Sequence, residues 1–194
     1  MDISEKEAQD SLEQIQTVVN HTRRTIASSY TSPLLILWGL IWIIAFMGTH
    51  FSIAGAYYIW TVLNSIGVVC TFMICLRQFY TANPTKIASA KKFCLRIFLF
   101  WGLLFAYIFI WLCVIKPYNG IQLNVFICTV IMFAYVVKGL WLECYHLVWL
   151  GLVVTCTTLI GFYLIPPDYY CLWMASTGGG AILGTGLYIR IFWK

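Results

Sequence analysis

Two apolar stretches of this chain each carry polar side chains that could hold a small solute. Asn64 stands four residues after Trp60, and Thr177 stands four residues after Trp173. In a small-molecule pocket, aromatic faces bind the apolar side of the ligand while an amide or hydroxyl group fixes its orientation. The matched spacing indicates a small polar pocket open to the outside, and the alternative is that these groups only form hydrogen bonds between helices. The residues predicted to line the pocket are Trp60, Asn64, Ser65, Trp173, Ser176 and Thr177.

A set of ionisable side chains, Lys138, Glu143 and His146, lies where two other apolar stretches meet. Lys138 lies about one turn from the end of its stretch, so its ammonium group can extend along the helix to water. Glu143 follows five residues later and would face a different side of the helix. The set predicts an inner gate for a solute. The alternative is that each side chain simply reaches the membrane surface.

The other chemistry-bearing residues argue against an enzyme. No Asp or Glu lies in the central part of an apolar stretch, which disfavours proton coupling through a carboxylate. The sequence contains no HExxH, no GxSxG and no phosphate-binding loop. His50 and His146 lie near opposite ends of their stretches, so they cannot hold a haem between them. We therefore predict no catalytic residues, no metal site and no cofactor.

The eight cysteines form no CxxC motif, and most are expected to pack as small apolar side chains. Cys113 and Cys171 differ, because both fall near the predicted outer ends of their stretches. They could form a disulfide if those stretches are neighbours. The sequence leaves their pairing open.

The elements that position these residues are six long apolar stretches. The chain is 61% hydrophobic and 10% charged, which is too apolar for a soluble domain of 194 residues. A helix needs about 20 apolar residues to cross the roughly 30 Å hydrocarbon core of a membrane. The sequence therefore predicts an all-α integral membrane protein whose six-helix transmembrane bundle occupies residues 33–194. The predicted spans are residues 33–51, 57–77, 93–115, 121–142, 146–165 and 170–192.

The basic residues predict how these spans are oriented. Eleven of the twelve Lys and Arg residues lie before span 1, around the connection of spans 2 and 3, or near the ends of spans 4 and 6, and Lys116 is the exception. Basic residues concentrate on the cytoplasmic side, so both termini are predicted to be cytoplasmic. We expect a multi-pass protein of the plasma membrane or inner membrane, in contact with bilayer lipid. This topology explains the net charge of +5 without nucleic-acid binding.

A short recurring motif predicts that the bundle is built from repeats. Trp38-Gly39-Leu40 in span 1 recurs as Trp101-Gly102-Leu103 in span 3 and, altered, as Leu150-Gly151-Leu152 in span 5. Each occurrence would begin one helical hairpin. The pattern thus predicts three tandem hairpins around a pseudo-threefold axis. Chance recurrence is the alternative, because Trp and Gly are common in membrane helices.

Span 6 is rich in glycine, and Gly180 and Gly184 form a GxxxG motif. Because glycine lets two membrane helices approach closely, the motif predicts helix packing within the bundle. Homodimerisation and a flexible gate are the alternatives.

Residues 1–32 form the one sizeable water-soluble segment. Ser4 and Glu7 form a capping box, and an apolar stripe at helical spacing includes Leu12, Ile15 and Val19. The acidic first half of the segment disfavours attraction to anionic lipid headgroups. We predict a cytoplasmic amphipathic helix whose stripe binds a cytosolic protein or a second copy of the chain. The alternative is that it packs on the chain's own loops or lies at the membrane interface.

Two functions fit these features. The leading one is binding or passage of a small neutral or weakly polar solute through the bundle, without carboxylate-based proton coupling. The alternative is a non-transporting assembly or regulatory subunit that engages a cytosolic partner through its N-terminal helix. In size, six predicted spans and N-terminal helix, the chain resembles the substrate-binding membrane subunits of vitamin importers. The stretch Leu37-Trp38-Gly39-Leu40-Ile41-Trp42 lacks their small-residue alanine pattern, so the resemblance implies architecture and no site residues.

Overall fold

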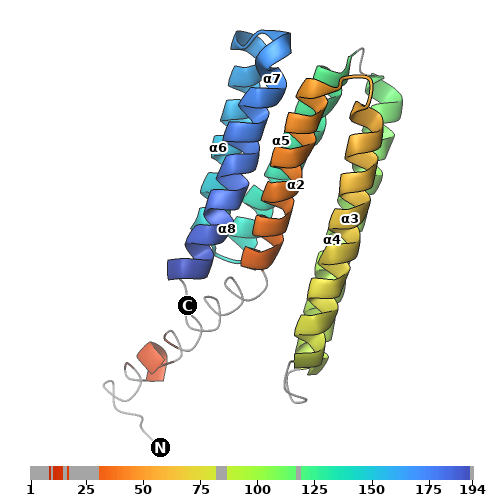
Figure 1. Cartoon of the computed structure of the whole chain (residues 1–194). Coiled ribbons are helices and arrows are strands. Elements are labelled where there is room, and N and C mark those ends of the chain that lie inside the picture. The colour runs from red at the N-terminus through yellow and green to blue at the C-terminus, as the bar shows by residue number, and fades with distance from the viewer. Residues whose placement is uncertain are drawn as a thin grey trace, which may run out of the picture.

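The computed structural model describes residues 9, 11–14, 17, 31–81, 87–116 and 119–192. From residue 31 onward these residues form a helical bundle without β-strands (Figure 1). Of the predicted partner-binding residues, Leu12 is exposed, whereas Ile15 and Val19 lie outside the described residues. The elements are α2 (Ser32–Phe51), α3 (Ala56–Thr81), α4 (Ile87–Ile115), α5 (Gly120–Trp141), α6 (Tyr145–Leu164), α7 (Pro167–Met174), the π-helical turn η3 (Ala175–Gly179) and α8 (Gly180–Phe192).

Five of these helices, α2 to α6, have the length and hydropathy of membrane spans. They coincide with the first five predicted spans to within a few residues at most ends. The predicted sixth span is also helical, but it consists of α7, η3 and α8 in succession. None of these three segments alone has the length of a span. The described chain therefore contains five candidate spans and one helical run interrupted by a π-helical turn.

The π-helical turn includes Ser176 and Thr177, two residues of the predicted pocket. Both hydroxyl groups donate to the carbonyl oxygen of Trp173, over 3.0 Å from Ser176 and 2.7 Å from Thr177. Local hydrogen bonds of this kind let Ser and Thr sit in an apolar helix, because the hydroxyl is satisfied by its own backbone. The turn itself packs on α2, where Gly178 lies against the ring of Trp42.

Glycine contacts bring the central helices close together. A Cβ atom placed on Gly39 of α2 would lie 2.6 Å from the backbone nitrogen of Leu183 in α8. A Cβ atom on Gly151 of α6 would lie 2.6 Å from the carbonyl oxygen of Met132 in α5. No side chain fits at such distances, so only glycine permits these two helix pairs to approach so closely. Similar backbone contacts occur at Gly139, Gly179 and Gly186.

The core lies between α2, α5, α6 and the α7–α8 run. The side chains that fill it are fully buried and mostly large and apolar, as expected for a closely packed interior. They include Leu35, Phe46, Met132, Leu147, Val154, Tyr170, Met174, Ile182 and Ile189.

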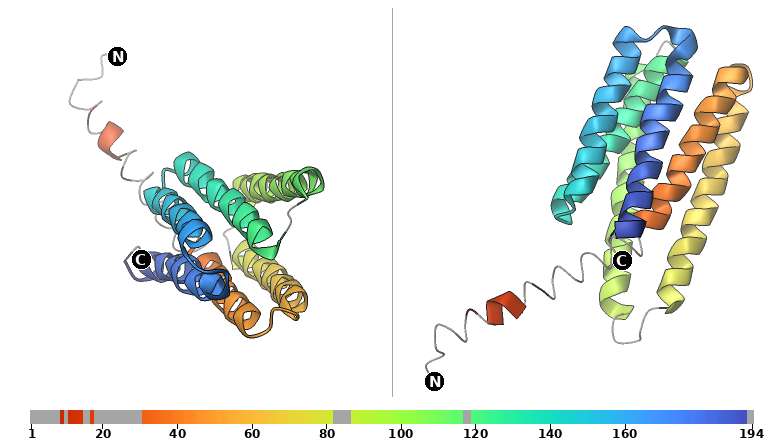
Figure 2. Two further views of the ribbon diagram at one scale, coloured as in Figure 1. Left: turned by 90° about the horizontal axis from the view of Figure 1, so that it is seen from above. Right: turned by 60° about the vertical axis from the view of Figure 1, so that its left-hand side comes forward.

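Helices α3 and α4 lie to one side of this core (Figure 2). In their most apolar stretches 6% of the residues are buried, against 33% in α2 and α6. Two indole hydrogen bonds join α3 to α2: Trp38 Nε1 donates to Thr71 Oγ1 at 3.2 Å, and Trp60 Nε1 donates to Thr49 Oγ1 at 3.1 Å. Helix α4 packs lightly on α5, where the rings of Trp101 and Tyr135 meet. The bundle thus has a closely packed part and a loosely packed part.

The three segments of the predicted repeat lie in unlike surroundings. Gly39 and Gly151 make close helix contacts, but a Cβ atom on Gly102 would meet no described atom within 4 Å. The closest helix pairs, α2 with α8 and α5 with α6, join different predicted hairpins, and the corresponding pair, α3 with α4, is not closely packed. A threefold arrangement would make these three pairs alike.

Candidate functional site

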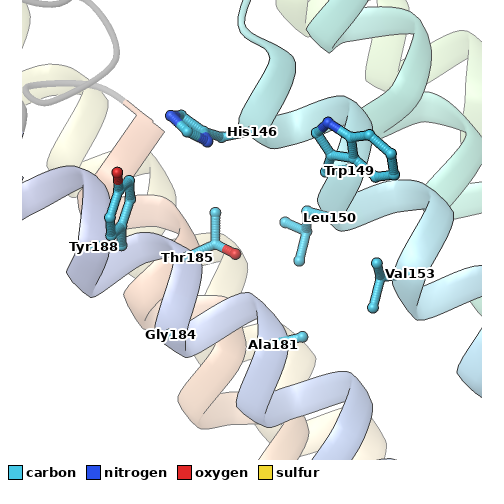
Figure 3. A pocket seen from close by; sticks show the side chains of 8 residues that line it. All are labelled: His146, Trp149, Leu150, Val153, Ala181, Gly184, Thr185 and Tyr188. Carbon is cyan, nitrogen blue, oxygen red and sulfur yellow. The ribbon is translucent and has the colours of Figure 1, made fainter.

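The candidate site is a groove between α6 and α8 with a volume of about 400 Å³ (Figure 3). This volume lies within the range of roughly 300 to 1,000 Å³ that is usual for small-molecule sites. The groove is open along one side, where Trp149 and Tyr188 are exposed, while Leu150 is buried at its base. Its lining residues are His146, Trp149, Leu150 and Val153 from α6, and Ala181, Gly184, Thr185 and Tyr188 from α8.

Small residues on α8 keep the groove open. Gly184 and Ala181 stand where larger side chains would fill the space toward α6 (Figure 3). A Cβ atom on Gly184 or Gly180 would meet no described atom within 4 Å. Neither glycine makes a close helix contact among the described residues, and their predicted role in helix packing stays a prediction. Gly179 and Gly186 make the close contacts of this run with α2, because they lie on its opposite face.

Polarity changes along the groove. At the end where α6 begins and α8 ends, the rings of His146 and Tyr188 meet edge to face with their centroids 5.2 Å apart, and Thr185 adds a hydroxyl group. The lining seven residues after His146 in α6 is Val153, and seven residues before Tyr188 in α8 it is Ala181. At 1.5 Å per residue, this apolar part lies about 10 Å from the polar end. The groove is thus polar at the helix ends and apolar toward the middle of the bundle, which suits a molecule with one polar end.

The residues of the predicted pocket lie at two different helix interfaces. Trp60 packs on Phe46 of α2 with ring centroids 5.0 Å apart. Trp173, by contrast, donates its indole N–H to the carbonyl oxygen of Thr157 in α6 at 2.8 Å. Asn64 is half-buried on α3. No contact among the described residues joins it to α6 or to Trp173.

The hydroxyl groups of the predicted pocket are engaged locally. Ser65 Oγ donates to the carbonyl oxygen of Thr61, and Ser176 and Thr177 both donate to that of Trp173. Ser65 and Ser176 are exposed on the outside of the bundle. The described contacts therefore assign these three side chains to their own helices and do not bring the six residues together.

The residues of the predicted inner gate lie at one end of the bundle, where α5 ends and α6 begins. His146 lines the groove toward α8, and Lys138, in the last turn of α5, is not one of the lining residues. Glu143 lies in the α5–α6 turn with a left-handed backbone conformation, φ 51°. Burial raises the pKa of the Cys144 thiol, and the nearby Lys138 and the backbone N–H groups of Leu147 and His146 oppose that shift.

A polar network at the end of the bundle where α5 and α7 begin was not predicted as a site. Tyr170 donates its hydroxyl to Asn124 Oδ1 at 2.8 Å, and Cys128 Sγ lies 3.5 Å from the same oxygen. This network joins α7 to α5. The sequence signal was Asn124 itself, an amide within an apolar stretch, but its tyrosine partner is 46 residues away and no spacing rule connects them.

The other chemistry-bearing residues show no further site. Cys113 and Cys171 are free thiols in the structure. Among the described residues, no group of three or more His, Cys, Asp or Glu side chains could hold a metal ion.

Five helices with the length and hydropathy of membrane spans define the chain as a polytopic membrane protein. No family model, no curated protein and no solved structure matches the chain. Its function must therefore be argued from the site.

Proposed function

We propose that this membrane protein binds a small, neutral or weakly polar molecule in the groove between α6 and α8. The observation that carries the proposal is the groove itself: about 400 Å³ of space, open on one side, with polar groups at one end and apolar groups at the other. Trp149 and Tyr188 would cover the apolar part of the ligand, and the hydroxyl of Thr185 with the imidazole of His146 would orient its polar end.

The groove suits binding better than passage across the membrane. The interior between α2, α5, α6 and the α7–α8 run is filled by fully buried side chains such as Phe46, Met132 and Met174. The groove opens sideways from the bundle, where lipid would surround the described helices. A molecule that partitions into the membrane could therefore enter without a channel through the core.

We also propose six membrane crossings with both termini in the cytoplasm, the α7–α8 run being the sixth. The basic residues at one end of the spans support this orientation. It places the polar end of the groove near the cytoplasmic surface. A cysteine introduced at position 83 should then be protected from an impermeant reagent added to intact cells, and one at position 119 should be labelled. Labelling at position 83 with protection at position 119 would show that the termini lie on the outer side, contrary to the proposal.

Native mass spectrometry of the detergent-purified protein tests the binding function. We expect the protein to retain a small molecule that is released on unfolding. Preparations that carry no small molecule, in several detergents and after addition of a membrane lipid extract, would contradict the proposal.

A second candidate function is that of an assembly subunit, and the exposure of α3 and α4 favours it. Both helices are as apolar as the central ones but bury few residues within the chain. Membrane helices with so few intramolecular contacts can pack against a partner helix. In the same mass spectra, a retained protein or a dimer would support this second function.

A further inference from the structure

Thr185 presents a hydroxyl group to the groove between α6 and α8 (Figure 3). Other hydroxyl groups of these apolar helices donate to a backbone carbonyl oxygen of their own helix, as Thr61, Thr129 and Thr158 do at 2.7 to 2.8 Å. Thr185 has no hydrogen bond with any described residue, and its oxygen is not enclosed by the protein. A hydroxyl group without a partner in apolar surroundings is costly. A ligand that bonds to it from the groove is therefore favoured.

The groove is short, because α7 meets α6 directly beyond it. The indole N–H of Trp173 donates to the carbonyl oxygen of Thr157 at 2.8 Å, and a Cβ atom on Gly161 would lie 2.6 Å from the same indole ring. Thr157 stands four residues after Val153, the last lining residue of α6, and so lies on the same helix face. The lining thus extends over about 10 Å, at 1.5 Å per residue, and ends inside the bundle.

The lining also restricts the charge and width of a ligand. None of the eight lining residues is Lys, Arg, Asp or Glu, so a charged group would find no fixed countercharge there. The groove lies between a single pair of helices, with the buried Leu150 at its base and the small Gly184 opposite, which leaves room for one acyl chain. Trp149 and Tyr188 are exposed at its open side. A chain longer than the groove can leave there into the surrounding lipid.

We propose that the groove binds an uncharged lipid with a single acyl chain and a hydroxyl-bearing head group, of which a monoacylglycerol is an example. This inference rests on the proposed binding function of the groove. The head group lies at the end formed by His146, Thr185 and Tyr188 and bonds to the hydroxyl group of Thr185. The first part of the acyl chain runs past Leu150 and Val153, and the remainder leaves through the open side.

Binding of a defined lipid to the full-length protein tests the contact with Thr185. The protein in a mild detergent is mixed with 1-monododecanoylglycerol, and native mass spectrometry measures the bound fraction. Thr185→Val keeps the side-chain volume and removes the hydroxyl group, so binding should weaken about 3- to 30-fold, as for loss of one hydrogen bond in a membrane. Thr185→Ser should bind like wild type. Thr155→Val makes the same change on α6 outside the lining and should also bind like wild type.

The wild-type protein alone tests the predicted head group and chain number, whether or not the variants fold. We expect it to retain 1-monododecanoylglycerol in preference to dodecanoate, which carries a charge, and to didodecanoylphosphatidylcholine, which carries two chains. Equal or greater retention of either competitor would overturn the inference.

Gly184→Leu, which fills the groove, separates this inference from the binding function itself. If Gly184→Leu loses the lipid but Thr185→Val binds it like wild type, the groove binds a ligand and the assigned head-group contact is wrong. If wild type retains a different small molecule and no 1-monododecanoylglycerol, the inference fails and the binding function stands. Retention of 1-monododecanoylglycerol by Gly184→Leu at the wild-type level would place the lipid outside the groove and overturn both.

Discussion

The central helices and the α3–α4 pair differ in packing although the pair is at least as apolar. The stretch Leu95–Ile115 of α4 has a mean hydropathy of 2.5, and α2 and α6 have 2.0, yet the α4 stretch buries the smaller share of its residues. The difference lies in the glycines. Gly39 and Gly151 let α2 and α6 approach their neighbours at backbone distance, whereas Gly102 of α4 faces open space.

This comparison shows what hydropathy can and cannot specify in a membrane protein. An apolar helix is stable in lipid whether or not it contacts another helix, because lipid tails are as apolar as leucine. Close contact instead depends on small residues that face a matching surface. We expect the packed part to respond strongly to changes at its glycines and α4 to tolerate a change at Gly102.

The largest effect is expected from Gly39→Ala. The added methyl group would lie 2.6 Å from the backbone nitrogen of Leu183, and backbone cannot move aside as a side chain can. Overpacking of this kind typically costs about 1 to 3 kcal/mol. Thermal unfolding in detergent should therefore show a clear loss of stability. Gly102→Ala, at the same position of the recurring motif, is the matched control and should leave the melting temperature unchanged or slightly higher, because alanine favours helix.

Equal effects of the two alanine substitutions would contradict the comparison. Such a result would mean that α4 is packed as closely as α2, for example against a second copy of the chain.

A smaller effect is expected from the hydrogen bond between Trp38 and Thr71, which joins α3 to the core. Thr71→Val keeps the side-chain volume and removes the acceptor. Hydrogen bonds between membrane helices contribute about 0.6 to 2 kcal/mol. Hydrogen exchange should increase along α3 and remain unchanged in α6. The double variant with Trp38→Phe should add little to Thr71→Val, and fully additive effects would show that the two side chains do not interact.

The helices could be predicted well from the sequence, because length and hydropathy act locally. The ends of α2, α5 and α6 lie within one residue of the predicted spans. The π-helical turn was not predicted, since it depends on how residues 175–179 pack on α2. The groove was missed for the same kind of reason. Its two sides come from residues 146–153 and 181–188, which are 35 residues apart, and the Gly180–Gly184 motif pointed to close packing where the structure has an open space.

The predicted solute pocket shows the limit of spacing arguments. Trp60 and Trp173 do occupy similar positions in their helices, and each donates its indole N–H toward a threonine of the preceding span. Nothing in the spacing could show that these two interfaces involve different partner helices, α2 for Trp60 and α6 for Trp173.

The smallest effect concerns the reactivity of two cysteines, Cys144 in the α5–α6 turn and Cys75 on α3. Burial raises the pKa of the Cys144 thiol, so less of it is thiolate at neutral pH, whereas Cys75 is exposed. N-ethylmaleimide should modify Cys75 faster than Cys144 in folded protein, as followed by peptide mass spectrometry. The rate at Cys144 should rise as the pH is raised toward its elevated pKa, because the thiolate is the reactive form. Equal rates at pH 7 would mean that Cys144 is not enclosed by the α5–α6 turn.

The central claim is that the groove between α6 and α8, in the packed part of the bundle, holds a ligand. Ligand retention by a matched pair of leucine variants tests it most directly. Gly184→Leu would fill the groove, and Gly102→Leu would add the same side chain to the exposed face of α4, where no described atom lies within 4 Å. Both should fold. We predict that wild type and Gly102→Leu retain the same small molecule in native mass spectrometry and that Gly184→Leu loses it. Retention by Gly184→Leu at the wild-type level would contradict the account.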